Sequence, residues 1–340
     1  MKDTKDTKAF EVDMKAWLLE GLGGLEKLKV GEAAMPTAKA DEVVLKVDFA
    51  SLNPADRYLA EGQYPARPTF PHILGRDAVG TVTAVGAAVT TLKVGDRACI
   101  LRTEVGVNTP GTFAEFVAVP AASLTAVPTG WTDEQAASAP LVYLTAYQAL
   151  TQFGALEKAV VLVTGASGGV GVASVQLAAA MGHTVVGLSR SDEKRKKLEG
   201  LGASLTLDPH DTQWRKRIKE YLGQRRVDLA VDNIGGSLFS EVLDTLGMNG
   251  RISCVGRLAG PVPSFNTAGL FFRRIRIGGV AVGTYTPAEA QAAWQAVLKL
   301  LSQAKAQPLV DSMWPFEKLI EAFGRLASGP MGKVVLQVKG

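Results

Sequence analysis

A run of small residues near the middle of the chain has the composition of a phosphate-binding turn. The sequence GASGGVG, residues 165–171, follows the apolar run VVLV at residues 160–163. Small residues between a strand and a helix let backbone N–H groups approach a pyrophosphate at the helix N-terminus. Ala166 replaces the first glycine of the usual G-x-G-x-x-G pattern, so the alternative is a tight turn without a ligand. We predict that a dinucleotide binds to Ala166, Ser167, Gly168, Gly169 and Val170.

The end of the next apolar run indicates which dinucleotide binds. There the sequence reads Ser189-Arg190, with Lys194 one turn into the following helix. NAD sites usually carry Asp or Glu at this point to bind the ribose 2′-hydroxyl, whereas NADP sites use Arg to bind the 2′-phosphate. Asp192 and Glu193 lie in the first turn of the helix, where acidic side chains stabilise the helix dipole. The pattern therefore predicts that the cofactor is NADPH rather than NADH.

Strands and helices in alternation position these residues. Between about residue 131 and residue 257, apolar runs such as TVVGLS alternate with helical stretches such as VASVQLAAAMG. Such alternation predicts an α/β domain with a parallel sheet covered by helices on both faces. A capping box at Thr132 and Gln135 predicts the first helix of this region. From Met14 to about residue 127, short alternating runs broken by Gly and Pro predict a β-rich region.

Length and composition limit the class of protein. The chain has 340 residues, 47% apolar and 21% charged, which predicts two soluble globular domains. No apolar run approaches the roughly 20 residues that span a bilayer. Residues 1–13 are charged, and we expect a flexible tail rather than an export signal. The cysteines Cys99 and Cys254 lack the spacing of a disulfide framework and fit a cytoplasmic protein.

Six motifs, including the glycine turn, occur in an order typical of one enzyme family. They are SLNPADRYLAEGQYP, FPHILGRDAVGTVTAVG, LKVGDRA, GTFAEFVAVP, PLVYLTAYQAL and GASGGVG. Together they resemble the zinc-independent quinone oxidoreductases of the medium-chain dehydrogenase/reductase superfamily. The final GKVVL is similar to the end of those chains, so the resemblance runs from Met14 to Gly340.

The resemblance implies a two-domain α/β fold. Residues 14–127 and 271–340 would form a GroES-like, β-rich catalytic domain. Residues 128–270 would form a Rossmann NADP-binding domain with a doubly wound parallel sheet. The active site would lie in the cleft between the domains, where pockets commonly form. Members of the family typically form homodimers, so we expect one here.

The resemblance also separates this chain from zinc alcohol dehydrogenases of the same superfamily. Their zinc ligands, a Cys, a His and a third Cys or Asp, correspond here to Asn53, Arg76 and Leu141. A leucine cannot bind zinc, and Cys99 stands alone where those enzymes have a four-cysteine zinc lobe. We therefore expect no metal, and reduction of an already electrophilic substrate rather than oxidation of an alkoxide.

Asn53 and Tyr58 are the candidate catalytic residues. In the family, the Asn of the SLNPADRY motif lies beside the nicotinamide and the substrate, and the Tyr lines the pocket. An amide and a phenol could orient the acceptor carbonyl and stabilise the oxyanion that forms as hydride arrives. The alternative for Asn53 is an Asn-Pro turn residue bonded to nearby backbone. The alternative for Tyr58 is a core aromatic residue.

Further cofactor contacts are implied by position within the family's motifs. Thr145 falls where a threonine hydroxyl reaches the nicotinamide, and its alternative is a hydrogen bond back onto its own helical turn. The loop and the phenylalanine pair that pass the nicotinamide correspond to Val255, Gly256, Arg257, Phe271 and Phe272. The two phenylalanines could equally belong to the core or to a dimer interface.

One residue common in the family is absent, and no histidine is a catalytic candidate. Many relatives carry a Tyr after the third strand of the cofactor domain, where this chain has Asp208-Pro209-His210. None of His72, His183 and His210 is expected to be catalytic, since each fits a structural or solvated position. Water or Tyr58 could supply the proton that follows hydride transfer.

These inferences predict an NADPH-dependent oxidoreductase that passes hydride to a quinone, an enal or an enone. The cofactor would supply the chemistry, and the protein would supply position and polarisation. One alternative is a relative of the zinc alcohol dehydrogenases. Another is an NADPH-binding protein that binds nucleic acid through the basic runs RSDEKRKK and WRKRIKEYLGQRR. Acids at helical spacing within both runs favour solvated helix faces instead. The sequence leaves the acceptor undefined.

Overall fold

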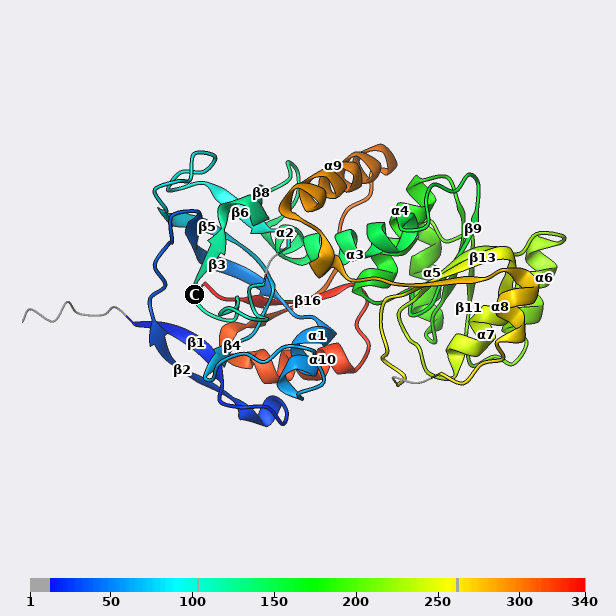
Figure 1. The fold of residues 1–340 in the computed structure, drawn as a ribbon, viewed down its shortest axis with the longest axis horizontal. Helices are drawn as coiled ribbons and strands as arrows, with labels where there is room; N and C mark the ends of the chain where they lie inside the picture. Colours follow the sequence, from blue (N-terminus) through cyan, green and yellow to red (C-terminus); the bar gives the residue numbers. More distant parts are fainter. Residues whose placement is uncertain (1–12, 103, 261–262, 340) are drawn as a thin grey trace, which may run out of the picture.

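A computed structural model describes residues 13–102, 104–260 and 263–339 of the chain. Two bodies lie side by side along the long axis, one built on mixed sheets and one on a parallel sheet (Figure 1). The amino-terminal and carboxyl-terminal parts of the described chain meet in the first body. The middle of the chain forms the second. The predicted flexible tail, residues 1–13, lies outside the described residues except for Asp13.

The parallel sheet has six strands in the order β11-β10-β9-β12-β13-β14. Their bounds are β9 Val160–Val163, β10 Thr184–Leu188, β11 Leu205–Leu207, β12 Val227–Asp232, β13 Leu246–Cys254 and β14 Arg276–Gly279. Side chains alternate between its two faces, as the period of a strand requires. Val161 and Val163 of β9 pack into one hydrophobic cluster, and Val160 and Leu162 pack into another. Both faces are therefore buried, which explains why β9 is apolar throughout.

Helices cover both faces of this sheet. Helices α3, α4 and α9 contribute to the cluster with Val161, whereas α6 and α7 contribute to the cluster with Val160. The bounds in this body are α3 Pro140–Thr151, α4 Gly169–Ala180, α5 Asp192–Gly200, α6 Trp214–Leu222, α7 Leu238–Thr245, α8 Ala268–Arg273 and α9 Pro287–Ala304, with a 3-10 turn at Val282–Thr284. The predicted doubly wound arrangement is confirmed.

The other body combines a seven-stranded and a three-stranded sheet. The larger has the order β15-β16-β3-β5-β6-β8 with β7 paired to β3, and the smaller has the order β2-β1-β4. The strand bounds are β1 Asp13–Leu19, β2 Leu28–Ala34, β3 Glu42–Ser51, β4 His72–Ile73, β5 Asp77–Val85, β6 Arg97–Ile100, β7 Phe116–Pro120, β8 Leu124–Ala126, β15 Val310–Pro315 and β16 Lys333–Gln337. The helices are α1 Pro54–Ala60, α2 Asp133–Ser138 and α10 Leu319–Ala327, with 3-10 turns at Leu25–Lys27, Ala121–Ser123 and Phe316–Lys318.

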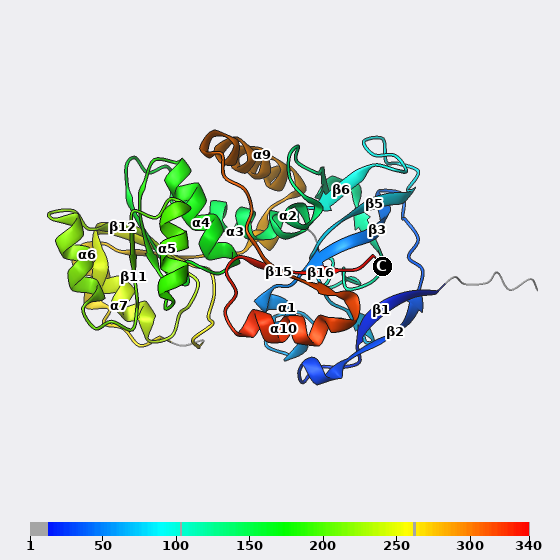
Figure 2. The ribbon, with the colours of Figure 1, turned by 180° about the vertical axis from the view of Figure 1, so that it is seen from behind.

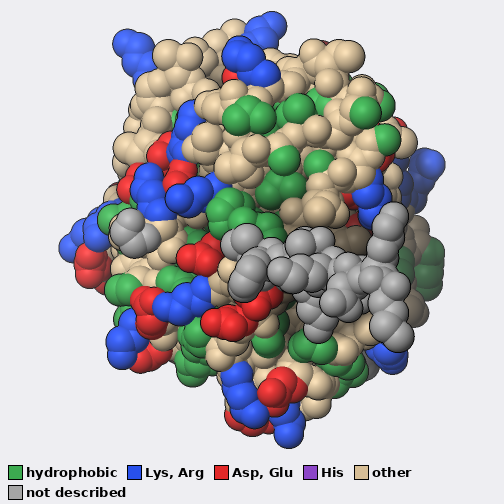
Figure 3. Space-filling model, turned by 90° about the vertical axis from the view of Figure 1, so that its left-hand side faces the viewer, with side chains coloured by type: hydrophobic (Ala, Val, Ile, Leu, Met, Phe, Trp, Pro, Cys, Tyr) green, Lys and Arg blue, Asp and Glu red, His purple; other side chains and the backbone are tan. Residues whose placement is uncertain are grey.

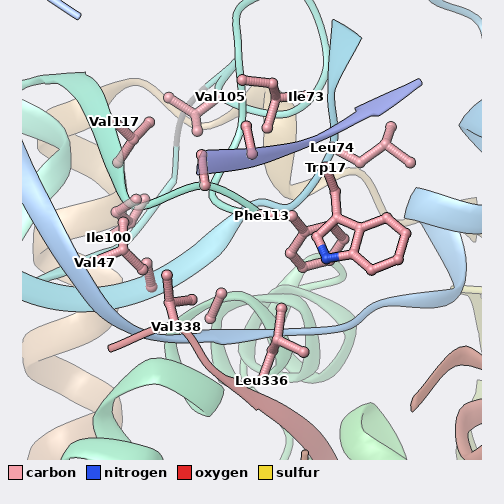
Figure 4. Close-up of a cluster of buried hydrophobic side chains, with 14 of the residues drawn as sticks. Trp17, Val47, Ile73, Leu74, Ile100, Val105, Phe113, Val117, Leu336 and Val338 are labelled. Atoms are coloured by element: carbon pink, nitrogen blue, oxygen red, sulfur yellow. The ribbon is translucent and has the colours of Figure 1, made fainter. Parts of the chain in front are cut away.

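One large apolar core holds this body together. Figure 4 shows Trp17, Val47, Phe113 and Leu336 converging from segments that are far apart in the sequence. The Trp17 indole Nε1 donates a 2.8 Å hydrogen bond to the carbonyl oxygen of Phe316, so its one polar atom is satisfied inside the core. Strand β16 lies beside β3 in antiparallel register, which joins the end of the chain to its amino-terminal part (Figure 2).

The structure suggests later domain boundaries than residues 127 and 270. Helix α2 begins after the predicted capping box of Thr132 and Gln135, but its Ala136 and Ala137 pack on the seven-stranded sheet. Strand β14 lies beyond residue 270 and yet pairs with β13 in the six-stranded sheet. These contacts support boundaries that differ from the sequence-based division. We propose that the second body extends from α3 to α9.

The end of the first body that faces away from the parallel sheet has a mixed surface. On the face seen in Figure 3, Lys and Arg side chains are interspersed with Asp and Glu side chains. Like charges do not gather there into one large patch. This face therefore gives no indication of a polyanionic partner.

Candidate functional site

The glycine turn between β9 and α4 is built around a close approach of two backbone segments. A Cβ atom on Gly171 would lie 2.2 Å from the carbonyl oxygen of Gly165, so only glycine fits there. Gly165 has a φ of +56°, and the N–H of Ala166 donates to the carbonyl oxygen of Leu188 in β10. The turn leads directly into α4, whose N-cap is Gly168. The free N–H groups of the first helical turn are available to an anion.

The five predicted turn residues lie together at this point. Gly168 is the N-cap of α4, with Gly169 and Val170 in its first turn. A Cβ atom on Gly168 would meet nothing closer than the Gly165 oxygen at 3.5 Å. The space in front of Gly168 is therefore open, as a cradle for a pyrophosphate requires. The Ser167 hydroxyl accepts a 3.3 Å hydrogen bond from that of Ser189, which connects the turn to the end of β10.

The residues predicted to bind the 2′-phosphate lie at the end of β10 and in α5. Arg190 is exposed, and within the described ranges its guanidinium makes no hydrogen bond or ion pair. Lys194 is partly buried, and its ammonium donates to the carbonyl oxygen of Gly329. Burial, followed by the positive charge of Arg325, lowers the pKa of Lys194. Residues 325–329 therefore lie next to Lys194, with the Arg325 guanidinium paired with Asp311 at 2.6 Å, and sequence reasoning missed this neighbouring segment.

Asp192 and Glu193 are engaged elsewhere, as predicted. Both lie in the first turn of α5, after the N-cap Ser191. Asp192 pairs with Lys196 at 3.0 Å and Glu193 pairs with Lys197 at 2.7 Å, each one turn along the same helix. Their carboxylates are exposed. These ion pairs and the helix dipole support α5.

Asn53 lies immediately before α1 in a buried polar cluster. Its side-chain Nδ2 donates to Oδ2 of Asp77 at 2.8 Å, and its Oδ1 accepts from the ammonium of Lys333 at 2.6 Å. The backbone N–H of Asn53 donates to Asp56 at 2.8 Å. Only 5% of Asn53 is exposed. The side chain therefore reaches across the fold to Asp77 and Lys333, and it also takes part in the capping box of α1 with Asp56.

Opposite charges balance inside this cluster. Arg76 lies 3.4 Å from Asp56, donates to the Tyr64 hydroxyl at 3.1 Å, and has its guanidinium 4.5 Å from the centre of the Tyr64 ring. Burial raises the pKa of Asp56 to about 6, in opposition to Arg76 and the Asn53 N–H, which lower it. Burial likewise lowers the pKa of Lys333, and Asp77 opposes that effect. Two acids and two cations thus offset one another in a site nearly closed to water.

Lys333 also contacts the glycine turn. The N–H of Gly332 donates to the carbonyl oxygen of Ser167 at 2.9 Å, and Gly168 and Gly332 form an isolated parallel bridge. A Cβ atom on Gly169 would lie 2.9 Å from Cδ of Lys333. The start of β16 therefore joins Asn53 to the turn. Sequence reasoning missed Lys333, although the GKVVL motif contained it.

The residues at the positions of zinc ligands do not fit zinc. Asn53 and Arg76 are held by Asp77, Lys333, Asp56 and Tyr64, and the guanidinium brings a positive charge. Leu141 offers no side-chain donor atom. Over residues 13–102, 104–260 and 263–339, no group of three or more His, Cys, Asp or Glu residues is arranged to hold a metal ion.

Tyr58 and Arg257 meet across the two bodies. The Arg257 Cζ atom lies 5.1 Å from the centre of the Tyr58 ring, and Arg257 Nη2 donates to the carbonyl oxygen of Gln63 at 3.0 Å. Burial raises the pKa of the half-buried Tyr58 phenol. Of the loop predicted to pass the nicotinamide, Val255 and Gly256 donate their N–H groups to the carbonyl oxygen of Asp232. Arg257 therefore connects the end of β13 to the segment that follows α1.

Three other predicted contacts have different surroundings. The Thr145 hydroxyl donates to the carbonyl oxygen of Leu141 at 2.7 Å, which is the local bond considered as its alternative. Phe271 and Phe272 are 65% and 73% exposed on α8, so they do not belong to the core. Helix α8 lies at the far end of the second body from α1 (Figure 1). The single chain thus keeps these phenylalanines away from Asn53.

The histidines occupy the structural or solvated positions expected for them. His72 is buried in β4, where burial lowers the pKa of its imidazole. His183 accepts a hydrogen bond from the N–H of Ala159 at 3.3 Å, and His210 is exposed. None of them contacts Asn53 or Tyr58 through a hydrogen bond within the described residues.

Two surface cavities lie away from this site. One of about 740 Å³ lies between α4 and the segment from Gln303 to Leu309. One of about 560 Å³ is lined by residues of α6 and by Arg225, Arg226 and Arg273 among others. Neither is lined by Asn53, Tyr58 or Arg190. Within the described part of the chain, the helices are too short or too polar to cross a membrane.

Comparisons with known proteins agree with this architecture. A family model described as an alcohol dehydrogenase GroES-like domain matches residues 39–129, and one described as a zinc-binding dehydrogenase matches residues 169–303. Quinone oxidoreductase of Lama guanicoe is 31% identical over 331 residues, which cover 96% of this chain and 98% of that protein. Acryloyl-coenzyme A reductase of Sulfurisphaera tokodaii is 29% identical over 93% of this chain and 98% of that protein.

A solved structure with a bound cofactor shares the whole fold. The mycobacterial protein Rv1454c, solved as a complex with NADPH, superposes with a TM-score of 0.86 at 28% identity. The superposition covers 96% of this chain and 100% of the mycobacterial chain. The GroES-like body and the Rossmann body are therefore both confirmed.

Proposed function

Because the chain belongs to the quinone oxidoreductase-like family of the medium-chain dehydrogenase/reductase superfamily, we propose that it is an NADPH-dependent oxidoreductase that needs no zinc. It reduces a quinone or an α,β-unsaturated carbonyl compound. The observation that carries this proposal is that the predicted catalytic residue Asn53 and the predicted cofactor turn lie next to each other. Lys333 contacts Asn53 with its ammonium and the glycine turn with its stem.

The glycine turn and the end of β10 hold the cofactor in this proposal. The open space at Gly168 and the first turn of α4 receive the pyrophosphate. Arg190, with its guanidinium free of partners within the described residues, and Lys194 bind the 2′-phosphate. A relative solved with NADPH supports the same choice of cofactor. Bound NADPH supplies a hydride to the acceptor.

Asn53 and Tyr58 orient the acceptor. Asn53 has one side-chain hydrogen left after its bond to Asp77, and this hydrogen donates to the acceptor oxygen as negative charge develops there. The Tyr58 phenol has no hydrogen-bond partner over the described ranges, so it is available to the same oxygen or to a water. Hydride addition and uptake of one proton convert a quinone to its hydroquinone. For an enone, hydride adds to the β-carbon and the proton to the α-carbon.

Zinc independence follows from the chemistry of the residues at the ligand positions. An amide, a guanidinium and an isobutyl group replace thiolate and imidazole donors at Asn53, Arg76 and Leu141. The positively charged Arg76 opposes binding of a divalent cation. An alcohol dehydrogenase activity of the zinc type therefore has less support than reduction of an electrophile. The description of the matched model as a zinc-binding dehydrogenase belongs to that family model.

A dimer and a cytoplasmic location are part of the proposal. Phe271 and Phe272 form an exposed aromatic pair with ring centres 4.5 Å apart, close to β14 at the edge of the six-stranded sheet. An exposed aromatic pair beside a free sheet edge supports pairing with a second copy. Light scattering of the purified protein gives the mass of the particle in solution. The mass of a single chain would contradict the proposed dimer.

A main role in nucleic-acid binding has less support. The basic runs lie on α5 and α6, where Lys216 pairs with Glu220 and Arg217 pairs with Asp211. Arg215 likewise lies 3.2 Å from Asp244. Acids thus neutralise part of the charge that would track a phosphate backbone. Binding of RNA that NADPH abolishes, and that weakens with salt, would revive this alternative.

NADPH consumption by the purified, chelator-treated protein tests the proposal. An ortho-quinone and a conjugated enone are supplied separately, and the organic products are identified. Saturable turnover of either acceptor, with no loss after zinc removal, is the expected result. Turnover that depends on added zinc, or oxidation of an alcohol in preference to both acceptors, would contradict it. The faster acceptor then identifies the substrate class.

A further inference from the structure

We propose that Lys333 is a positioning residue that fixes the Asn53 amide so that the site recognises an acceptor through an N–H group. The inference rests on the proposed function, because it assigns Asn53 to the contact with the acceptor. Lys333 itself touches neither substrate nor reacting atoms in this proposal. It acts through Asn53, from the first position of the last strand.

The ammonium of Lys333 has all its hydrogens directed at protein oxygens. It donates to Oδ1 of Asn53 at 2.6 Å, to the carbonyl oxygen of Leu52 at 2.9 Å and to Oδ2 of Asp77 at 3.4 Å. The residue is 5% exposed, so water does not compete for these bonds. An ammonium group has three hydrogens and no acceptor. Its three protein partners therefore leave it no free donor.

This arrangement decides which way the Asn53 amide faces. Because lysine can only donate, the amide atom that faces Lys333 must be the oxygen. Because an ionised carboxylate can only accept, the atom that faces Asp77 must be the nitrogen. Rotation of the amide by half a turn would place N–H against ammonium and oxygen against carboxylate. Lys333 and Asp77 thus hold the amide in one orientation.

The fixed orientation has a consequence for the ligand. The Asn53 oxygen is bound by Lys333, and one Nδ2 hydrogen is bound by Asp77. One Nδ2 hydrogen remains, so Asn53 offers a donor to whatever lies in the site. A ligand group that accepts a hydrogen bond, such as the carbonyl oxygen of a quinone, an enone or an enoyl thioester, fits this donor. An alcohol that must donate its hydroxyl hydrogen does not.

Lys333 also sets where Asn53 lies relative to the cofactor turn. The lysine stem passes over Gly169, where an added Cβ atom would lie 2.9 Å from Cδ of Lys333. The preceding residue, Gly332, donates its N–H to the carbonyl oxygen of Ser167. The stem and the backbone of β16 therefore connect the amide of Asn53 to the turn expected to hold the cofactor. Displacement of a reacting group by about 1 Å can lower a rate roughly a hundredfold.

The test compares Lys333→Met, Asn53→Ala and the double variant. Methionine keeps a linear stem and removes the donor. Turnover of 1,2-naphthoquinone gives kcat and KM, and quenching of protein fluorescence gives the NADPH Kd without turnover. Lys339→Met is the matched control, because Lys339 follows the same strand, its side chain is 41% exposed, and it lies 3.8 Å from Asp48, which also pairs with Arg97.

We expect Lys333→Met to lower kcat roughly tenfold, as loss of an orienting side chain typically does, with little change in the NADPH Kd. The double variant should be no slower than Asn53→Ala, since Lys333 acts through Asn53. The control should match the wild type. Independent, multiplicative losses in the double variant would overturn the proposal. So would unchanged kcat in folded Lys333→Met, which is the result expected of a purely structural lysine.

A measurement on the wild-type protein covers the case in which Lys333→Met does not fold. The side-chain amide of Asn53, assigned by comparison with Asn53→Ala, is followed by its ¹⁵N resonance. We expect one Nδ2 hydrogen protected from exchange and one that shifts when p-benzoquinone is added. Two freely exchanging hydrogens would overturn the positioning role. If the wild type reduces no acceptor, the proposed function fails, while the protected hydrogen still reports the orientation set by Lys333.

Discussion

The guanidinium of Arg257 lies over the ring of Tyr58, with 5.1 Å between Cζ and the ring centre. The two residues belong to different bodies of the molecule, and Arg257 also donates to the carbonyl oxygen of Gln63. A cation over an aromatic face at such a site stabilises by about 0.5–1 kcal/mol. Because Tyr58 is a candidate for contact with the acceptor, the pair places a positive charge next to the proposed site of reduction.

Arg257→Ala should lower kcat/KM several-fold while the free energy of unfolding falls by only about 1 kcal/mol. The loss of rate follows from the freed Tyr58 ring and the lost bond to Gln63. Steady-state kinetics and urea unfolding measure the two quantities. Arg276→Ala is the control, because Arg276 stacks on Phe153 at 5.5 Å outside the site. Equal losses of kcat/KM in both variants would show that Arg257 has no special relation to the site.

Arg190→Ala and Lys194→Met should weaken NADPH binding without affecting NADH binding. Each lost charge-assisted hydrogen bond to a phosphate costs about 1.5–3 kcal/mol, or roughly tenfold or more in Kd. Fluorescence titration of both cofactors measures the preference for NADPH over NADH. This preference should also fall as the salt concentration rises. Lys196→Ala is the control, since Lys196 lies on the same helix in an exposed ion pair with Asp192. Tighter binding of NADH than NADPH by the wild type would refute the assignment.

Gly168→Ala and Gly171→Ala should separate cofactor binding from folding. At Gly168 an added Cβ meets only open space, so the variant should fold with nearly normal stability and bind cofactor poorly. At Gly171 the Cβ would lie 2.2 Å from a backbone oxygen, so the variant should lose stability as well. Thermal unfolding and NADPH titration distinguish the two. Normal NADPH affinity of Gly168→Ala would place the pyrophosphate elsewhere.

The buried Asp56 should make stability depend on pH in a specific direction. Burial raises its pKa from the usual value of 3.8 to about 6, so between these values the folded state binds more protons than the unfolded state. The contribution of Asp56 to stability is therefore greatest below about pH 4 and falls as the pH rises to about 6. A shift of about two pKa units corresponds to about 3 kcal/mol.

Asp56→Asn isolates this contribution from the other carboxylates. Urea unfolding of both proteins between about pH 4 and pH 7 gives the difference in their free energies of unfolding. The wild type should gain stability relative to Asp56→Asn as the pH falls. A constant difference, or a gain in the opposite direction, would mean that Arg76 keeps Asp56 ionised throughout this range.

Local patterns in the sequence were enough to predict the cofactor turn and the elements around it. A strand, a glycine turn and a helix are neighbours along the chain, so residues 160–180 contain the information for their own arrangement. The capping residues Thr132 and Ser191 likewise act on backbone groups only three residues away. The family motifs added the GroES-like body, and the comparisons confirm it.

The contacts of the candidate site were decided by the tertiary structure. Lys333 and Asn53 are 280 residues apart, and Arg257 and Gln63 are 194 residues apart. No spacing along the chain predicts such pairs, because pairing of β16 with β3 and packing of the two bodies bring them together. Thr145, by contrast, has a local contact, because its hydroxyl donates to a carbonyl oxygen one helical turn away.

Short-range interactions thus account for the elements predicted along the chain and for the predicted dinucleotide turn, because hydrogen bonds and apolar periodicity act over a few residues. The hydrogen bond between Lys333 and Asn53 and the pairing of β14 with β13 arise only when the chain has folded. Those outcomes depend on burial of side chains from distant segments. Burial removes water as a competing partner and so determines which polar groups must satisfy one another.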